Sequence, residues 1–516
     1  MQLLIDLLVE QGVTDFFVSP GSRNSPLIIA ATRNPKVNLH RHFDERGLGF
    51  FALGFALATK RPVAVVVTSG TAVGNLMPAV MEASHASIPL ILLTADRPPE
   101  LRDAAANQAS DQVKMFSNFV RFQFDLDPTM PPKAIASKIA QGVFNSLWPH
   151  PGPIQINCPL REPLYPLASA PQIPSLLFQI APLSALPPLQ LPARGVILVG
   201  RLPSHSDLFA VLKLAQKLKW PVFADILSEA RLYPTAEQIA HFDRMDLMAD
   251  CVLHFGERLT SKKMETFRAP RYIHVSPYPQ WIDPFHAVTE RIVTNIESFQ
   301  ANAPIDEEWL SFWKQKDQFL EELISEALEE APHTESALVA NLSQLPLENH
   351  AVFFANSMPI REANWFFRPS RCKAFFANRG LSGIDGNIAT IAGIAEHFPT
   401  LAILGDLTTL HDLNSLALLK NSKHPISLIV LNNQGGGIFS HLAFSQDPAA
   451  PSFIVYEHSF GFEAAARMFH IPYAHSQLPS LAQSEIIEWT TSRSENYLFH
   501  SKLKNRINTE LITSNK

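Results

Sequence analysis

Short, continuous runs of apolar and β-branched residues recur along this chain of 516 residues and constrain its fold more than any other feature. Stretches with helical spacing of apolar residues separate the runs. Such runs are typical of strands buried on both faces, which occur in parallel sheets covered by helices. The pattern therefore predicts an α/β protein built from doubly wound, mainly parallel sheets. The runs are 15–20, 62–70, 89–95, 153–159, 195–200, 221–226, 251–256, 271–277, 351–357, 373–380, 400–406 and 426–433.

The length allows about three domains, at about 150 residues each. Prolines indicate the first boundary, because eight of them fall in the uncharged stretch 163–193, which is typical of a semi-rigid linker. An acidic helix expected over Glu307–Glu330 precedes Ala331-Pro332 and indicates the second. The first and last thirds could contain related sheets. We predict a first domain over 1–165, a Pro-rich linker over 166–193, a middle domain over 194–331 and a last domain over 332–516.

Composition narrows the class of protein. Lys and Arg number 42 against 48 Asp and Glu, and this net charge of −6 argues against a globally basic nucleic-acid binder. The three cysteines form no CxxC pair and are typical of reduced thiols in a cytoplasmic protein. The first residues, MQLLIDLLVEQG, resemble an amphipathic helix rather than a signal peptide. We expect a soluble cytoplasmic protein that binds neither nucleic acid nor a membrane.

Two polar pairs at the ends of expected strands give the clearest chemical signal. Gly405-Asp406 and Asn432-Asn433 follow successive strands, and Asp406 and Asn433 are 27 residues apart, enough for a helix and the next parallel strand. A carboxylate and an amide oxygen there can share one hard cation with backbone carbonyls and diphosphate oxygens. The glycines after Asn433 permit close approach of backbone to phosphate. The alternative is two ordinary strand–helix turns, in which Asp and Asn cap helices.

Glu45 is a second candidate. It follows an expected strand and precedes a helix of small and apolar residues over 47–58. A partly buried carboxylic acid in this place can share a proton with a heteroatom of a ligand. The alternative is a solvated carboxylate stabilised by the helix dipole. GLGFFA within the helix matches GxGxxA, but charged residues precede it, so it is a weak dinucleotide signal.

Cations form the third candidate group. Four arginines follow expected strands, and two lysines follow the middle-domain run 251–256. Cations that converge on one cleft would suit a substrate with several carboxylates, and arginine is favoured where a planar carboxylate is gripped by two hydrogen bonds. The alternative is that half of them are solvated surface charges. The group comprises Arg23, Arg97, Arg361, Arg379, Lys262 and Lys263.

With these motifs, the chain resembles the thiamine diphosphate enzymes of the decarboxylase and synthase type. Within that family it is most similar to one branch, the 2-succinyl-5-enolpyruvyl-6-hydroxy-3-cyclohexene-1-carboxylate synthases of menaquinone biosynthesis. The similarity is close in the first and last domains, except over the stretch from Gln446 to the C-terminus, and thin in the middle domain. The matching segments are SPGSRNSPL (19–27), HFDERGLGF (42–50), VTSGTAVGNLMPA (67–79), LTADRPPEL (93–101), ANQ (106–108), NRGLSGIDG (378–386), GDLTTLHDLNSLALL (405–419) and NNQGGGIF (432–439).

The resemblance implies a pyrimidine-binding, a middle and a diphosphate-binding domain. It implies thiamine diphosphate bound between the first domain of one subunit and the last of another, in a homodimer or homotetramer. Asp406, Asn433 and the Gly435 carbonyl would bind Mg²⁺ or Mn²⁺, Glu45 would hydrogen-bond the pyrimidine as the catalytic residue, and Ile438 would support the bent cofactor. The other implied cofactor contacts are Thr68, Ser69, Gly70, Gly383, Ile384, Gly405, Leu407, Gly436 and Phe439.

The implied reaction is decarboxylation of 2-oxoglutarate, followed by 1,4-addition of the resulting succinyl-semialdehyde carbanion to isochorismate. Two departures from the family pattern stand out: Leu407 replaces the last glycine of a GDG motif, and Lys263 replaces the arginine more common in the branch. The implied substrate contacts are Ser22, Arg23, Arg97, Asn107, Gln108, Lys262, Lys263, Ser357, Arg361, Arg379, Ile438, Phe439 and Leu442.

Three other interpretations compete with this one. Another thiamine diphosphate-dependent decarboxylase or synthase, acting on a different 2-oxoacid, would need fewer cations. A regulatory nucleotide-binding protein on doubly wound sheets would have no need of Glu45. A scaffold without any ligand would have no use for the polar residues at the strand ends.

Overall fold

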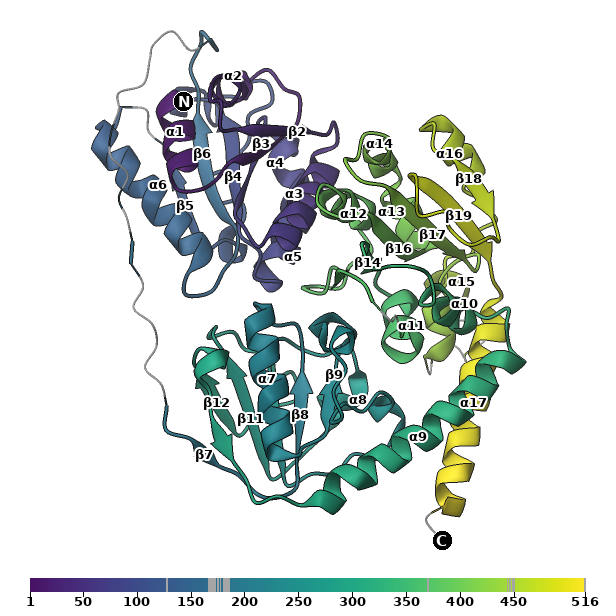
Figure 1. The fold of residues 1–516 in the computed structure, drawn as a ribbon. Helices are drawn as coiled ribbons and strands as arrows, with labels where there is room; N and C mark the ends of the chain where they lie inside the picture. The colour runs from purple at the N-terminus through teal and green to yellow at the C-terminus, as the bar shows by residue number, and fades with distance from the viewer. Residues whose placement is uncertain are drawn as a thin grey trace.

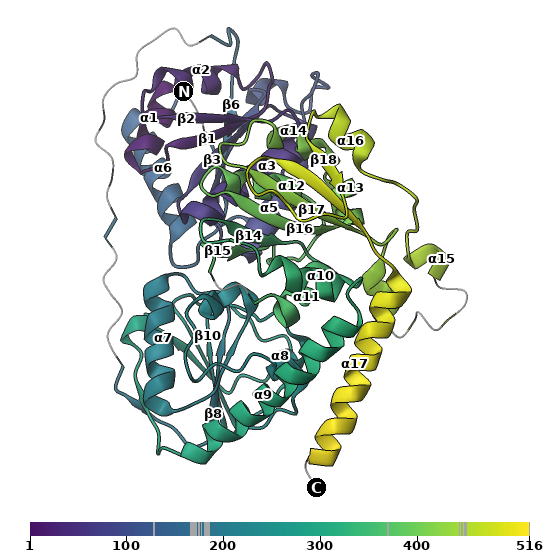
Figure 2. The same cartoon turned by 45° about the vertical axis from the view of Figure 1, so that its right-hand side comes forward.

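Three parallel sheets follow one another along the chain, as the purple, teal and green-to-yellow parts of Figure 1 show. Every strand pair in them is parallel, which confirms the α/β class. The middle sheet lies to one side of the first and last sheets, which lie next to each other (Figures 1 and 2). The computed structural model describes residues 1–126, 129–165, 173, 176, 178, 179, 186–368, 371–442, 444, 447 and 451–514.

The first sheet has the strand order β2-β1-β3-β4-β6-β5. Successive residues of its strands point to opposite faces, so Phe16 packs in a core with α1, α2 and α6, whereas Phe17 packs against α3 and α5. The strands are β1 (Asp15–Val18), β2 (Asn38–Arg41), β3 (Val63–Val67), β4 (Leu90–Asp96), β5 (Phe122–Asp125) and β6 (Ile154–Pro159). The helices are α1 (Gln2–Glu10), α2 (Ser25–Arg33), α3 (Glu45–Thr59), α4 (Thr71–Asn75), α5 (Met77–His85) and α6 (Pro132–Leu147).

The last sheet repeats this topology. Its order is β15-β14-β16-β17-β19-β18, which is the order of the first sheet when strands are counted from β14. The expected relation between the two sheets is therefore confirmed at the level of strand order. The strands are β14 (Ala351–Phe354), β15 (Ala374–Phe376), β16 (Thr400–Gly405), β17 (Ile426–Asn432), β18 (Tyr473–His475) and β19 (Glu485–Thr490). The helices are α10 (Glu335–Leu342), α11 (Met358–Phe366), α12 (Asn387–Ala395), α13 (Asp406–His411), α14 (Leu416–Leu419), α15 (Pro451–Ile454), α16 (Glu463–Met468) and α17 (Arg493–Ser514).

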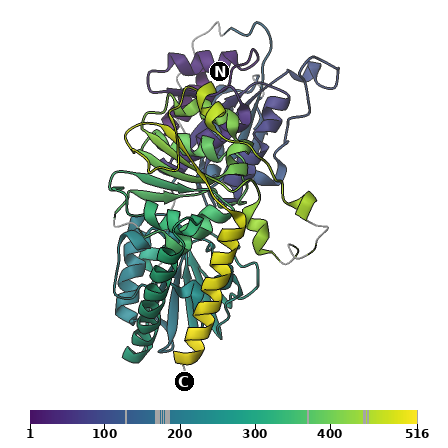
Figure 3. The same cartoon turned by 90° about the vertical axis from the view of Figure 1, so that its right-hand side faces the viewer.

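The middle sheet has the order β12-β11-β10-β8-β9. The acidic helix expected over Glu307–Glu330 is confirmed as α9, which leads to the last sheet and packs beside the C-terminal helix α17 (Figure 3). The strands are β8 (Gly195–Val199), β9 (Val222–Ala224), β10 (Cys251–Phe255), β11 (Arg271–Ser276) and β12 (Glu290–Val293), with α7 (His205–Leu218), α8 (Lys262–Thr266) and the separate parallel pair β7 (Leu189–Gln190) and β13 (Ala301–Asn302).

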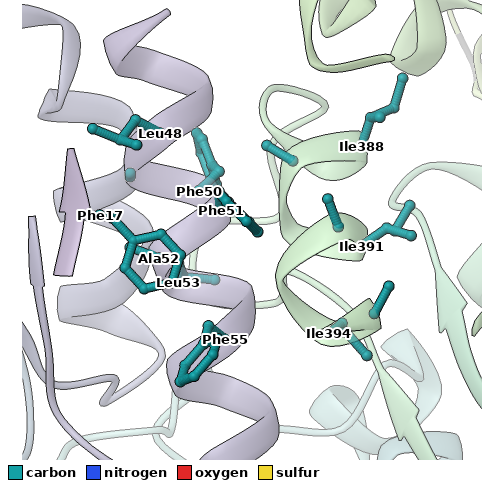
Figure 4. Close-up of a cluster of buried hydrophobic side chains, with 14 of the residues drawn as sticks. Phe17, Leu48, Phe50, Phe51, Ala52, Leu53, Phe55, Ile388, Ile391 and Ile394 are labelled. Carbon is teal, nitrogen blue, oxygen red and sulfur yellow. The ribbon is translucent and has the colours of Figure 1, made fainter. Parts of the chain in front are cut away.

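Helices α3 and α12 join the first and last sheets (Figure 4). Phenylalanines of α3 face the isoleucines Ile388, Ile391 and Ile394 of α12 in one buried core. Glycine permits this close approach, because a Cβ at Gly54 would lie 2.0 Å from the Thr390 carbonyl oxygen and one at Gly393 would lie 2.2 Å from that of Phe51. The first and last sheets therefore share one core rather than a loose contact.

Each run predicted as a strand contains one, and the sequence did not indicate β5, β12, β18, β19 or the two-residue strands β7 and β13. The domain boundaries at 165, 193 and 331 stay a prediction, and most of the stretch 166–185 lies outside the described residues. Among the helices described, none is long and apolar enough to cross a membrane.

We expect this fold to lose stability in mild acid because of buried histidines on adjacent strands. His274 donates from Nε2 to the Gly256 carbonyl at 3.0 Å, and His254 donates to that of Glu257 at 3.0 Å. Burial lowers the pKa of His254 to about 3 and that of His274 to about 4. Unfolding restores the ordinary pKa near 6.5, so between these values the unfolded chain binds more protons. Stability present above about pH 6.5 is therefore lost as the pH falls towards about 4.

Melting temperatures measured from about pH 7 to about pH 5 test this expectation. The variant His274→Gln keeps an amide donor for Gly256 but cannot be protonated, so its melting temperature is expected to fall less steeply with acid. Equal slopes for the variant and the wild type would remove His274 from the acid response.

Candidate active site

A cavity of about 310 Å³ opens at the carboxyl ends of β14 and β16. These strands are neighbours in the sheet, yet the chain leaves them in opposite directions, so a crevice forms between the connections that follow them. Residues from both connections and from the loop after β17 line it. The expected site residues in its wall are Ser357, Arg361, Arg379, Ile384, Gly405, Asp406, Leu407, Asn433, Gly436, Ile438 and Phe439.

Oxygen atoms suited to a hard cation face this cavity. Asp406 is the first residue of α13 and is 3% exposed; its carboxylate accepts hydrogen bonds from the backbone N–H groups of Leu407 at 2.6 Å and Gly435 at 2.8 Å. Asn433 donates its amide nitrogen to Glu335 at 2.9 Å, and its Oδ1 is buried without a hydrogen-bond partner. Buried polar atoms are normally paired, so this oxygen fits a ligand such as Mg²⁺. Within the described residues, no group of three His, Cys, Asp or Glu side chains could hold a metal ion, so a metal bound here would also need amide, carbonyl or ligand oxygens.

Gly435 has a contact that the sequence did not indicate. Its φ is +100°, and a Cβ there would lie 1.9 Å from the Tyr456 carbonyl oxygen, so only glycine fits. Its own carbonyl accepts a hydrogen bond from Arg493 at 3.2 Å, and Arg493 also pairs with Glu457 at 2.6 Å. A metal bound by this carbonyl would share the oxygen with Arg493 or displace that hydrogen bond.

Two other side chains beside Asp406 and Asn433 were missed from the sequence. Glu335, the first residue of α10, accepts hydrogen bonds from Asn433 and from Thr491 at 2.8 Å. Burial raises the pKa of Glu335 to about 7. His458 lies with Nε2 3.4 Å from the Asp406 carboxylate. Neither residue follows an expected strand, so no sequence signal connected them with Asp406.

A second cavity, of about 380 Å³, adjoins the first and shares with it the wall residues Met358, Arg361 and Ile438. The expected contacts Lys262, Lys263 and Leu442 line it as well. Ser261 caps α8 by accepting from the backbone N–H of Met264 at 3.2 Å, which places both lysines at the helix start. Burial lowers the pKa of Lys263. The structure therefore brings cations of the middle and last sheets to one place.

The expected residues of the first sheet gather elsewhere, around Ser69. Gly21, after β1, lies close to the end of β3, because a Cβ on Gly21 would be 2.5 Å from the Cβ of Thr68. Ser69 accepts a hydrogen bond from Arg97 and exchanges two, each 3.0 Å long, with Gln108. Ser22, after β1, and Asn107, after β4, are exposed. The backbone N–H of Gly70 donates to the Gln112 side chain. Arg23 donates to the Leu160 carbonyl at 2.9 Å.

Glu45 begins α3 and is half-buried, with Asp44 as the helix cap. Its neighbour Arg46 donates to the His411 carbonyl at 2.7 Å, so the start of α3 lies beside the end of α13. Neither cavity described above is lined by Glu45 or by the group around Ser69. Gly383 lies behind the first cavity, where its carbonyl accepts from Asn356 at 2.7 Å. Within one chain the expected site is thus divided into two groups.

Comparisons with known proteins fit this arrangement. Residues 1–115 match the family model described as thiamine pyrophosphate enzyme, N-terminal TPP binding domain. Residues 190–354 match the one described as middle domain of thiamine pyrophosphate. The fold, the crevice with its oxygen ligands and these matches define a thiamine diphosphate-dependent enzyme.

Curated relatives narrow the family. Three relatives are named 2-succinyl-5-enolpyruvyl-6-hydroxy-3-cyclohexene-1-carboxylate synthase. The one from Salinibacter ruber is 35% identical to this chain, over 98% of this chain and 95% of that protein. The one from Rubrobacter xylanophilus is 36% identical, over 97% of each. The one from Shewanella amazonensis is 35% identical over 92% of this chain and 89% of that protein. The chain belongs to the family of these synthases. Because the matches span nearly the whole chain, they include the middle domain, where the sequence motifs had been thin.

The contact between Glu335 and Asn433 leads to a prediction about metal binding. Replacing Glu335 with alanine removes the acceptor that holds the Asn433 amide nitrogen, so the amide can turn its oxygen away from the cavity. We expect the apparent affinity for Mg²⁺ in cofactor binding to fall about tenfold or more.

Titration of thiamine diphosphate at a series of Mg²⁺ concentrations measures this change. Glu335→Gln keeps an acceptor oxygen and is expected to have a smaller effect, and Glu348→Ala, at an exposed position, is the control. Unchanged Mg²⁺ dependence in the folded alanine variant would show that Asn433 needs no support from Glu335.

Proposed function

We propose that this protein catalyses the thiamine diphosphate- and Mg²⁺-dependent decarboxylation of 2-oxoglutarate and the 1,4-addition of the remaining four-carbon unit to isochorismate, in menaquinone biosynthesis. The observation that carries the proposal is the pair of adjoining cavities with Arg361 in the wall of both. Arg379 lies in one cavity, and Lys262 and Lys263 lie in the other. Two substrates with carboxylates can therefore be bound side by side, each next to a cation.

The residues at the first cavity fit the cofactor and its metal. Asp406 and Asn433 would hold Mg²⁺ through a carboxylate and an amide oxygen, and Gly405 leaves room for a ligand because a Cβ there would meet nothing within 4 Å. Thiamine diphosphate, when bound, would supply a nucleophile for a keto carbon and an electron sink for the loss of CO₂. Glu45 would hold and move a proton at the aminopyrimidine. Leu407, Ile438 and Phe439 would exclude water.

We also propose a homodimer or homotetramer in which the group around Ser69 and Glu45 of one chain meets the Asp406 cavity of another. The separation of these two groups within the chain supports this assembly. A cytoplasmic location is consistent with the cysteines Cys158, Cys251 and Cys372, which are all free thiols. The proposed domains are 1–165, 194–331 and 332–516, and each contains one of the large sheets.

The test supplies purified protein with thiamine diphosphate, Mg²⁺, 2-oxoglutarate and isochorismate, follows isochorismate consumption and identifies the product by mass. Consumption that requires all four additions is the expected result. Release of CO₂ from 2-oxoglutarate without consumption of isochorismate would point instead to a decarboxylase. No reaction and no cofactor binding would overturn the proposal.

A further inference from the structure

Arg244 lines the second cavity and was not indicated by the sequence. It ends the 3-10 turn η5 (Phe242–Arg244), and the carbon of its guanidinium lies 4.5 Å from the centroid of the Trp365 ring. Its Nε and Nη2 atoms are buried and have no hydrogen-bond partner. No ion pair within 4.0 Å joins this guanidinium to an acidic side chain of the described residues. A buried guanidinium whose donors are free is costly unless a ligand accepts from it.

The nearest acid in sequence, Asp243, forms no ion pair with Arg244, and its oxygens are hydrogen-bonded to other groups. Asp243 accepts hydrogen bonds from the Ser261 hydroxyl, from the Asn364 amide at 2.9 Å and from the Trp365 indole at 3.2 Å. Among the described residues in the wall of this cavity Asp243 is the only acid, whereas Arg244, Lys262, Lys263 and Arg361 all lie in that wall. The wall therefore carries an excess of positive charge.

The contact with Trp365 leaves hydrogen-bond donors of Arg244 unused. The guanidinium carbon lies over the ring in a cation–π contact, while Nε and Nη2 remain available to a ligand. These groups match the two oxygens of a carboxylate. Burial and the charge of Arg244 both lower the pKa of Lys263, which indicates that the two cations act on the same space.

We propose that Arg244 binds a carboxylate of the acceptor substrate, at the part of the second cavity formed with Trp365. This inference rests on the proposed function and adds to it a residue that determines specificity. In the proposed function the donor 2-oxoacid binds in the first cavity, which Arg379 and Asp406 line. Arg244, which lines only the second cavity, therefore distinguishes acceptors that carry a carboxylate from those that do not.

The test compares Arg244→Gln with the wild type, both supplied with thiamine diphosphate and Mg²⁺. Isochorismate is titrated by calorimetry without 2-oxoglutarate, so that binding is measured without turnover, and KM values for both substrates are then obtained from initial rates. We expect Arg244→Gln to weaken isochorismate binding and to raise its KM by about ten- to a hundredfold, because a charge-assisted pair is lost. For the donor substrate, 2-oxoglutarate, the KM is expected to change less than about twofold.

Two further variants separate binding from folding. Arg268→Gln is the matched control, because Arg268 is also stacked on an aromatic ring in the middle domain, at 5.7 Å from Phe285, but is exposed. It is expected to leave both KM values unchanged. Arg244→Lys keeps the charge without the planar fork and is expected to weaken isochorismate binding by about threefold or more. If Arg244→Gln does not fold, the isochorismate affinity of Arg244→Lys tests the inference in its place.

The outcomes are distinguishable. Unchanged isochorismate affinity in a folded Arg244 variant, or a raised KM for the donor substrate instead, would overturn the inference while the proposed function stands. A third outcome is that the wild type binds isochorismate more tightly than Arg244→Gln but does not convert it. That result would support the carboxylate site at Arg244 and overturn the proposed reaction. Wild-type protein that neither binds nor converts isochorismate would overturn both.

Discussion

Replacing Glu45 with glutamine is expected to lower kcat by about a hundred- to ten-thousandfold, the range in which a positioned acid or base contributes to catalysis. Glutamine has nearly the same size and can still form a hydrogen bond, but it cannot take up and release a proton. Glu45 begins α3, and Asp44 caps that helix with its own side chain, so the fold is expected to remain. Binding of thiamine diphosphate is expected to change little.

The measurement is kcat together with the dissociation constant of thiamine diphosphate. Asp44→Asn is the matched control, because it removes the same charge one residue away and keeps a side chain that can cap the helix. It is expected to retain most of the turnover. Undiminished turnover in Glu45→Gln would remove Glu45 from the mechanism.

Replacing Asp406 with alanine is expected to weaken Mg²⁺-dependent binding of thiamine diphosphate by about a hundredfold or more and to abolish turnover at ordinary cofactor concentrations. The substitution removes a carboxylate oxygen that would bind the metal. It also removes the acceptor for the N–H of Gly435, which holds the glycine loop after Asn433 in place. Both losses act on the same cofactor-binding step.

Cofactor titrations with and without Mg²⁺ measure this effect. Leu407→Gly, one residue further along α13, restores the glycine usual in related enzymes and is expected to keep Mg²⁺-dependent binding. Cofactor binding by Asp406→Ala with its Mg²⁺ dependence unchanged would place the metal elsewhere.

Most of the sheet architecture could be predicted because the buried strands are continuously apolar. β19 could not, although it lies inside the last sheet between β17 and β18. It contains Glu485 and Glu488, which are 5% and 4% exposed. Glu488 accepts hydrogen bonds from Asn432 at 2.6 Å and from Tyr473 at 2.8 Å, and these partners belong to the other strands of the sheet. Such compensation depends on tertiary contacts, so the sequence pattern of β19 gives no sign of burial.

The candidate site shows the same limit. Asp406 and Asn433 could be found because the residue after a parallel strand has a known position in a sheet. Glu335 comes from the start of a helix and Arg244 from a 3-10 turn, and only the packing of the middle and last parts of the chain brings them to the cavities. The division of the expected residues into two groups fits the binding between subunits that the family resemblance implied, but spacing along the chain alone does not show which strand ends face each other.

The repeated strand order bears on how many ligands the proposed dimer can hold. The strand order gives each chain two switch points at which a crevice can form, one between β1 and β3 and one between β14 and β16, with different side chains at each. A molecule with two chemically different ends can then be bound between the first crevice of one chain and the second crevice of its neighbour. Two-fold symmetry produces that pairing twice. Calorimetric stoichiometry should therefore be one cofactor per chain, and a monomeric variant should bind neither end with full affinity.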